Sequence, residues 1–296
     1  ESAVPDPAIA ALADELRDAL APGIQLLQPI GAGGMGHVFL GRDPLLKRQV
    51  AIKVLAPALA NDTVARARFV REAEASAAVS HPNVVGIHLV GELPRSKTPY
   101  FVMQFIEGRT LADEIAARSS MSEPRARRII GEVASALAAA HSRGLVHRDI
   151  KPANIMIEAD SERPVVLDFG ISAILERAPV MAESKLTQAG TYLGTPTYMS
   201  PEQASGEPVT EKSDVYSLGA VAFELLSGRP PFQGQTLVVM AAHVKESAPA
   251  LHGLRPDIDP HLAELVDRCL AKRPARRPAA SEIAQSLLPE GRTVVE

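Results

Sequence analysis

The sequence has few of the features that mark secreted, membrane-spanning or strongly charged proteins. Cys269 is the single cysteine among 296 residues, so no disulfide can form within the chain, and a reducing compartment fits best. No apolar run approaches the roughly 18 residues that cross a bilayer, and the N-terminus has no basic-then-apolar signal pattern. A formal net charge of -4 gives no general attraction to nucleic acid or to an anionic membrane. We therefore expect a cytoplasmic chain that contacts neither of them.

Internal repeats and low-complexity tracts are also missing. With 46% hydrophobic residues, the chain can bury a sizeable core. Because it begins with Glu1 rather than Met, we expect it to be cut from a longer protein. That protein would have room for a membrane span or a sensor domain outside these residues.

Residues 1–23 predict one amphipathic helix. Asp6 and Pro7 form a helix start signal, apolar residues then recur at helical spacing, and Pro22-Gly23 stops the pattern. Two interpretations are open. The helix either packs on the region that follows or makes a regulatory or dimer contact.

Residues 24–105 have the pattern of a small antiparallel sheet that carries one helix. Asn61-Asp62-Thr63 can cap this helix, which should end before His81-Pro82. The expected strands are Ile24–Ile30, Val38–Leu40, Val50–Leu55, Val84–Val90 and Tyr100–Phe105.

A glycine-rich stretch, residues 31–36, separates the first two strands. Its glycines would let backbone N–H groups approach phosphate oxygens closely. The G-x-G-x-x-G spacing also occurs in dinucleotide-binding loops, but those open a helix, whereas here Val38-Phe39-Leu40 and a turn follow. A β-hairpin is therefore predicted. His37 is expected to be a solvent-facing loop residue, with phosphate binding as the alternative.

Lys53 lies inside an apolar strand, where an unpaired ammonium group would be costly. It therefore needs an anion, either phosphate oxygens or a carboxylate on the nearby helix. Glu72 shares one face of that helix with Phe69 and Ser76, whereas Glu74 points elsewhere. We expect Glu72 to be the partner, and a surface role within the helix is its alternative.

The most informative stretch is residues 147–154, His-Arg-Asp-Ile-Lys-Pro-Ala-Asn, read together with Asp168-Phe169-Gly170. Pro152 excludes a regular helix, so Asp149 and Asn154 share a short loop, and Asp168 follows an apolar run that predicts a buried strand. Phosphoryl transfer from a nucleotide needs one group to orient the attacking hydroxyl and oxygen ligands to hold magnesium. Asp149 suits the first role, and Asn154 and Asp168 suit the second. A polar loop with a structural ion pair is the alternative.

These two signatures resemble the H-R-D-x-x-x-x-N and D-F-G motifs of eukaryotic-type protein kinases. Further resemblances follow in order: Val38 after the glycine-rich stretch, Ala51-Ile52-Lys53, and Ser200-Pro201-Glu202. Lys151 and Thr195 stand in motifs that resemble those of serine/threonine kinases rather than tyrosine kinases. The sequences of residues 33–36 and 200–203 resemble those of the bacterial members of this class. The resemblance implies an α+β, two-lobed kinase domain over residues 24–288. Its parts would be an antiparallel-sheet N-lobe with one main helix (24–105), a mostly helical C-lobe (108–288) and a tail (289–296).

The resemblance further implies an enzyme that transfers the γ-phosphate of ATP to serine or threonine hydroxyls of proteins, using Mg²⁺ or Mn²⁺. Lys53 would pair with Glu72, and Lys151 would neutralise charge on the transferred group. Adenine would hydrogen-bond to the backbone around Gln104 and Ile106. The expected nucleotide contacts are Ile30, Gly31, Ala32, Gly33, Gly34, Met35, Gly36, His37, Val38, Ala51, Lys53, Met103, Gln104, Ile106 and Met156.

Residues 171–199 resemble an activation segment that receives a protein substrate. Arg148 needs a nearby anion, and a phosphothreonine would supply one. Thr187 and Thr191 are the candidate acceptors, and an unmodified loop is the alternative. Autophosphorylation in trans within a homodimer is compatible with this. A nucleotide-binding pseudokinase is the alternative to an active enzyme.

Four structural expectations concern the chain beyond residue 120. A helix opened by Ser122, Glu123 and Pro124 should bury residues 129, 130, 133, 137 and 140 and close at Gly144. Asp214 should tether the backbone of the catalytic loop, cap the next helix, or do both. Glu202 and Arg277 should form a buried pair, and Cys269 should be plain core.

Overall fold

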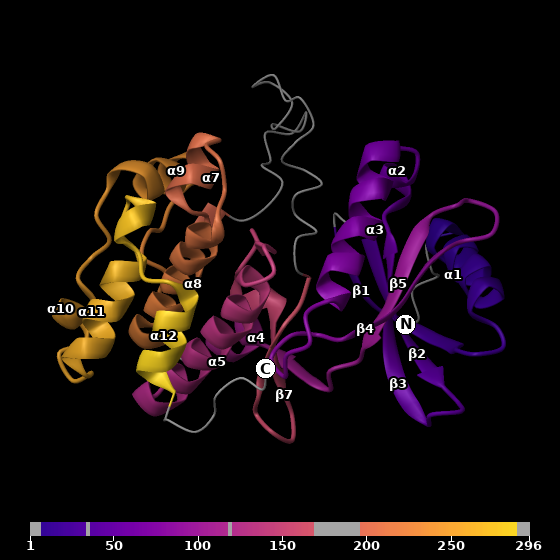
Figure 1. Ribbon diagram of the computed structural model, residues 1–296, viewed down its shortest axis with the longest axis horizontal. Coiled ribbons are helices and arrows are strands. Elements are labelled where there is room, and N and C mark those ends of the chain that lie inside the picture. The colour runs from indigo at the N-terminus through magenta and orange to yellow at the C-terminus, as the bar shows by residue number, and fades with distance from the viewer. Residues whose placement is uncertain (1–6, 34–35, 118–119, 169–195, 289–296) are drawn as a thin grey trace. The chain divides into compact units, whose positions relative to one another are not determined.

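A computed structural model describes residues 7–33, 36–117, 120–168 and 196–288, which form two compact units (Figure 1). The first unit contains residues 7–78 and 86–105, and the second contains residues 79–85 and the described residues from 106 onward. Within these ranges, no helix is both long enough and apolar enough to cross a membrane.

The first unit is built on a five-stranded sheet with the order β1-β2-β3-β5-β4, in which all neighbours are antiparallel. This confirms the small antiparallel sheet expected for the first lobe. The elements are α1 (Pro7–Leu20), β1 (Gln25–Gly33), β2 (Gly36–Asp43), β3 (Arg48–Leu55), α2 (Pro57–Ala60), α3 (Thr63–Ala77), β4 (Ile87–Glu92) and β5 (Pro99–Gln104).

This sheet carries a helix on each face (Figure 1). Successive residues of a strand point to opposite faces, so β3 can present apolar side chains to both helices. Val50, Ile52 and Val54 of β3 pack with α1 in one apolar cluster. On the other face, the ring of Phe69 in α3 lies 5.1 Å from that of Phe101 in β5. Lys53 therefore belongs to the α3 face.

Helix α1 packs on its own unit, as the first of the two interpretations expects. Leu12, Leu16 and Leu20 are buried in the cluster behind β3. The carboxylate of Glu15 accepts the backbone N–H groups of Arg95 (2.5 Å) and Ser96 (2.6 Å) in the turn between β4 and β5. The helix is thus fixed by apolar burial and by a polar anchor.

The apolar run at residues 84–90 does not form one strand, so this prediction was wrong at its first residues. β4 begins at Ile87, whereas Val84 forms a parallel bridge with Val166 in the second unit. The Val85 N–H also donates to the Val166 carbonyl at 3.0 Å. The run has two different pairing partners, which hydrophobicity alone cannot distinguish.

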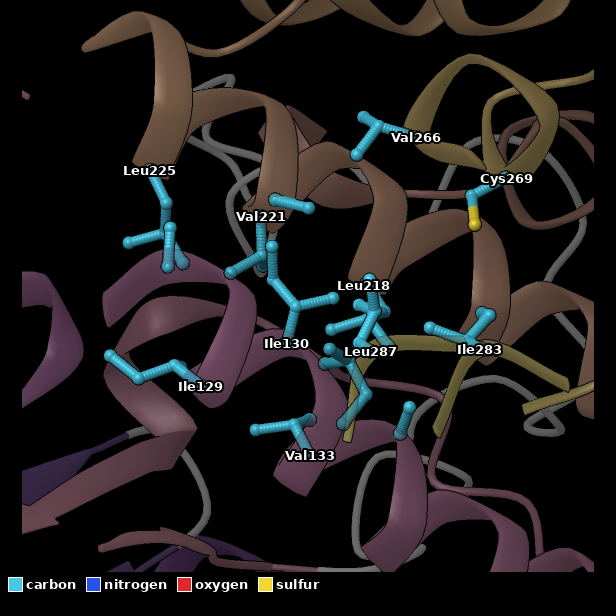
Figure 2. Packing of buried hydrophobic residues seen from close by; sticks show 14 of the residues in the cluster. Ile129, Ile130, Val133, Leu218, Val221, Leu225, Val266, Cys269, Ile283 and Leu287 are labelled. Atoms are coloured by element: carbon cyan, nitrogen blue, oxygen red, sulfur yellow. The ribbon is translucent and has the colours of Figure 1, made fainter. Parts of the chain in front are cut away.

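The second unit is mostly helical, as expected. Its elements are β6 (Gly108–Thr110), α4 (Leu111–Ala116), α5 (Glu123–His141), η1 (Pro152–Asn154), β7 (Ile155–Glu158), β8 (Pro164–Val166), η2 (Pro196–Tyr198), α7 (Pro201–Ser205), α8 (Glu211–Ser227), α9 (Thr236–Lys245), α10 (Leu251–Leu254), α11 (Pro260–Cys269), η3 (Pro274–Arg276) and α12 (Ala280–Leu287). Figure 2 shows side chains of α5, α8, α11 and α12 meeting in one cluster, which includes Cys269. The predicted inward face of α5 is confirmed, since all five residues are buried. Burial also raises the pKa of Cys269 to about 12, as expected for a core thiol.

Helix α8 begins earlier than the sequence pattern predicts. Thr210 is its N-cap and accepts the N–H of Lys212, while Ser213 closes a capping box with the Thr210 backbone. Asp214 lies in the first turn and is not the cap, so that alternative for Asp214 was wrong. The carboxylate is left free for another use.

Candidate active site

The catalytic loop lies between α5 and β7 in the second unit. Pro152 allows only the single 3-10 turn η1 before β7 begins. β7 pairs with β8, and the Leu167 N–H then donates to the Asn154 carbonyl at 2.9 Å. This pairing brings Asp168, which is distant in sequence, next to the loop that carries Asp149 and Asn154.

One oxygen of Asp149 is held by two neighbours. The Lys151 ammonium lies 2.7 Å from Asp149 Oδ2, and the Asn154 amide donates to the same oxygen at 3.0 Å and to the Asp149 carbonyl at 2.8 Å. Among the residues that the structure describes, none donates to Oδ1, and the side chain is one-third exposed. The carboxylate is oriented and still has an oxygen available to a hydroxyl group.

Asn154 and Asp168 present the oxygen donors that a hard divalent cation takes. The Asn154 nitrogen is the atom that faces Asp149, because both of its partners there are acceptors, which leaves the amide oxygen for a ligand. No cluster of three or more His, Cys, Asp or Glu side chains suited to a metal occurs within the described ranges. A cation held by Asn154 and Asp168 would complete its shell with phosphate and water oxygens.

Asp214 tethers the backbone of the loop, as predicted. Its Oδ2 accepts hydrogen bonds from the His147 backbone N–H and the His141 ring Nε2–H, both at 2.8 Å, and its Oδ1 accepts one from the Arg148 N–H at 2.7 Å. Arg148 has a φ of +69°, in the left-handed region that non-glycine residues rarely adopt. The buried carboxylate of Asp214 therefore holds a strained backbone directly before Asp149.

His147 and Gln203 are two further positioning residues, and neither was predicted. His147 is fully buried, accepts the Asp149 N–H at Nδ1 (3.2 Å) and donates from Nε2 to the Leu167 carbonyl (2.7 Å). Gln203 of α7 donates to the Arg148 carbonyl at 2.6 Å. These contacts join parts of the chain 20 and 55 residues apart, and no local pattern indicates them.

In the first unit, the glycine-rich stretch forms the predicted hairpin. Gly33 at the end of β1 pairs with Gly36 at the start of β2. Gly36 has a φ of +156°, and a Cβ atom there would overlap the Val54 carbonyl oxygen, so only glycine fits. His37 is not a solvent-facing loop residue: it lies in β2, half-buried, opposite Ala32 and Val54.

Lys53 is buried in β3, between Val38 of β2 and Phe101 of β5. The α3 face predicted to point inward is confirmed by the burial of Phe69 and Ser76, and Glu74 is exposed. The side chain of Glu72 lies outside the described part of the structure. Its pairing with Lys53 stays a prediction.

The expected adenine contacts are divided between the two units. In the first, Ala51 pairs with Met103 across β3 and β5, and both are buried, whereas Ile30 is exposed. The Gln104 N–H already donates to the Gly86 carbonyl at 2.8 Å, so a contact there would need another backbone atom. In the second unit, Ile106 is buried and Met156 is half-buried in β7.

Gly34, Met35 and the activation-segment residues Thr187, Thr191 and Thr195 lie outside the described ranges. Within those ranges, the Arg148 guanidinium has no ion pair.

The predicted Glu202–Arg277 pair is confirmed, with two hydrogen bonds of 2.7 and 3.0 Å between buried groups.

Residues 24–288 match the protein kinase domain family. The chain belongs to this family. It is 41% identical over 268 residues to the serine/threonine-protein kinase PknB of Mycolicibacterium smegmatis, covering 89% of this chain and 42% of that protein. It is 39% identical over 259 residues to PrkC of Bacillus subtilis, covering 87% and 39%. The crystal structure of the Mycobacterium tuberculosis PknI kinase domain has a TM-score of 0.69 at 30% identity, covering 90% of this chain and 95% of that one.

These relatives confirm the kinase fold and the serine/threonine class that the motifs predict. The kinase family uses ATP and a divalent metal ion, so the chain is an ATP-dependent protein kinase domain. It spans about two fifths of the length of the curated relatives it matches.

Proposed function

We propose that this kinase transfers the γ-phosphoryl group of ATP to serine and threonine hydroxyls of proteins, with Asp149 orienting the acceptor. The observation that carries this proposal is the state of the Asp149 carboxylate. Lys151 and Asn154 hold Oδ2, while Oδ1 has no partner in the described part of the chain. A fixed carboxylate with one available oxygen suits a group that receives a hydroxyl proton.

The remaining residues supply positioning and charge. The acceptor oxygen attacks the γ-phosphorus as the bond to the ADP oxygen breaks, and the acceptor proton moves to Asp149. Lys151, two residues beyond Asp149, would offset charge on the transferred group. Lys53, paired with Glu72, and the N–H groups of residues 31–36 would hold the phosphates. Positioning and electrostatics of this kind carry most of such catalysis.

Asn154 and Asp168 would hold Mg²⁺, with Mn²⁺ as a substitute, since an amide oxygen and a carboxylate are hard donors. The bound cation would screen the negative charge of the phosphates. The base would contact Ile30, Val38, Ala51, Met103 and Met156, and hydrogen-bond to the backbone around Gln104 and Ile106. His37, next to Gly36 at the start of β2, would contact a phosphate.

We also propose that the segment between Asp168 and Ser200 receives the protein substrate and is itself phosphorylated, at Thr187 or Thr191. Arg148 supports this, because its guanidinium has no ion pair within the described residues and could bind a phosphate. Phosphorylation in trans would require a homodimer. The need for ATP and the lone buried thiol of Cys269 favour a cytoplasmic catalytic domain.

The test is intact mass before and after incubation with magnesium and ATP, followed by transfer to a generic protein substrate. Wild type should gain phosphates, and Asp149→Ala should gain none while keeping its circular dichroism spectrum. Asp160→Ala, a change in an exposed turn, is the matched control and should behave as wild type. Thermal stabilisation by magnesium-ATP without any transfer would contradict the proposal and indicate a pseudokinase.

A further inference from the structure

Two buried side chains, from α8 and α9, and a half-buried lysine beyond α11 form a chain of polar contacts that reaches the turn η2. His243 of α9 is fully buried, with Nε2 3.0 Å from the Thr197 carbonyl of η2 and Nδ1 3.0 Å from the hydroxyl of Tyr216 in α8. The Lys272 ammonium, beyond α11, lies 3.2 Å from the same hydroxyl oxygen. We call these three side chains the His243 relay.

The hydrogen bonds of this relay have one consistent direction. The Thr197 carbonyl can only accept, so His243 Nε2 carries a proton, and the Lys272 ammonium can only donate, so the Tyr216 oxygen accepts from it. The Tyr216 O–H then donates to Nδ1 of His243. Each of these contacts is satisfied when His243 is the neutral Nε2–H tautomer.

The surroundings of the relay favour that neutral form. Burial, followed by the positive charge of Lys272, lowers the pKa of His243 to about 4. Lys272 is itself fixed by the Ala242 and His243 carbonyls, at 3.2 and 2.8 Å, and lies over the ring of Phe232 at 4.6 Å. The imidazole is therefore held at Nδ1 by a hydroxyl that is itself anchored, and its Nε2–H is directed at the Thr197 carbonyl.

We propose that His243 is a positioning residue for the protein substrate, acting through the Thr197 carbonyl. This rests on the proposed function, because Thr197 lies near the end of the segment expected to receive that substrate. A second contact holds the same turn, since the Tyr198 hydroxyl donates to Glu224 of α8 at 2.5 Å. With His243 removed, the turn keeps this contact but loses the one that orients its Thr197 carbonyl.

The kinetic test compares KM for a serine/threonine peptide with KM for ATP. His243→Phe keeps a flat ring and loses both hydrogen bonds, so the peptide KM should rise about fivefold, the equivalent of one neutral hydrogen bond. The ATP KM should stay within about twofold, since no nucleotide contact is assigned here. His243→Gln has an amide donor and acceptor and should recover most of the peptide KM.

Tyr216→Phe is a milder variant, because it keeps the ring and removes only the hydroxyl, so it serves if His243→Phe does not fold. It should raise the peptide KM by about two- to threefold. His252→Phe, at an exposed histidine of α10, and Tyr100→Phe, in the first unit, are the matched controls. A lower melting temperature with unchanged peptide KM in both relay variants would overturn the proposal.

Nitrogen-15 NMR of labelled histidines gives a readout that does not depend on activity. Wild type should show His243 as the Nε2–H tautomer at neutral pH, and Tyr216→Phe should change its Nδ1 resonance. A charged or Nδ1–H imidazole would overturn the relay. A wild-type domain that phosphorylates no peptide would contradict the proposed function, and this proposal with it, whereas an active wild type with unaffected variants contradicts only the relay.

Discussion

Two buried carboxylates, one in the first turn of α8 and one on α7, have different roles. Asp214, on the helix, accepts two backbone N–H groups of the catalytic loop. Glu202, on α7, is paired with the Arg277 guanidinium and accepts the Ser213 hydroxyl at 2.5 Å. Ser213 and Asp214 are neighbours in sequence, so one helical turn holds both the catalytic loop and the segment that follows the activation segment.

The difference lies in what each carboxylate fixes. An acceptor for backbone N–H groups determines main-chain conformation, here at a residue with a φ of +69°. A side-chain ion pair joins two elements and leaves their backbones to other contacts. Loss of Asp214 should therefore affect catalysis most, and loss of Arg277 should affect stability most.

Asp214→Ala should give the largest change in activity. It leaves the His147 and Arg148 N–H groups without their acceptor, so Asp149 moves from its position, and a misplacement of this kind lowers kcat by about 10²-fold. Asp214→Asn keeps one acceptor oxygen and should lie between this variant and wild type. Peptide kinetics on proteins matched by circular dichroism make the measurement, and an unchanged kcat would remove the distinction between the two carboxylates.

Arg277→Met should give the largest change in stability. It leaves the Glu202 carboxylate buried and uncompensated, which lowers the free energy of unfolding by about 3–5 kcal/mol. The double variant Glu202→Gln/Arg277→Met, which removes the charge as well, should recover much of this loss. Urea titration measures all three proteins, and a double variant no more stable than Arg277→Met would contradict the explanation.

The pH dependence of stability should identify the Glu202 contribution. Burial alone would raise the pKa of Glu202, but hydrogen bonds from Arg277 and Ser213 hold it below its ordinary value of 4.5. Such a group contributes stability that is complete above pH 4.5 and is lost as the pH falls through the lower folded-state pKa. Glu202→Gln should therefore show a flatter decline in unfolding free energy below pH 4.5 than wild type. Parallel curves would contradict this assignment.

Thr210→Ala should give the smallest effect and separates helix capping from tethering. Removal of this N-cap lowers the free energy of unfolding by about 1 kcal/mol. The kinetic constants should stay unchanged, because Asp214 still holds the catalytic loop. A fall in kcat comparable with that of Asp214→Asn would show that capping and tethering are coupled.

The sequence predicts the parts of this site that depend on local order. Pro152 and the spacing of Asp149 and Asn154 indicate the catalytic loop, and the strand after Gly36 distinguishes a hairpin from a helix-opening loop. Kinase resemblance adds the tether at Asp214 and the Glu202–Arg277 pair. Those features need only neighbouring residues or a known motif order.

Contacts between side chains on different elements were not predictable in the same way. His243, Tyr216 and Lys272 meet because α8, α9 and the chain after α11 pack together, and nothing in their own segments indicates a partner. The prediction of a single strand over residues 84–90 was wrong for a related reason. Val84 pairs with a residue of the second unit, whereas β4 pairs with β5 in the first. A hydrophobic pattern indicates that a residue is buried, but it does not indicate which other element that residue packs against.

Helix α1 lies before the residues that match the kinase family, yet it packs on one face of the first sheet. Leu12, Leu16 and Leu20 close over β3, and full burial of one such side chain is worth about 2 kcal/mol. Glu15 adds the polar anchor to the turn before β5. The unit of homology therefore starts at residue 24, while the unit of folding starts one helix earlier.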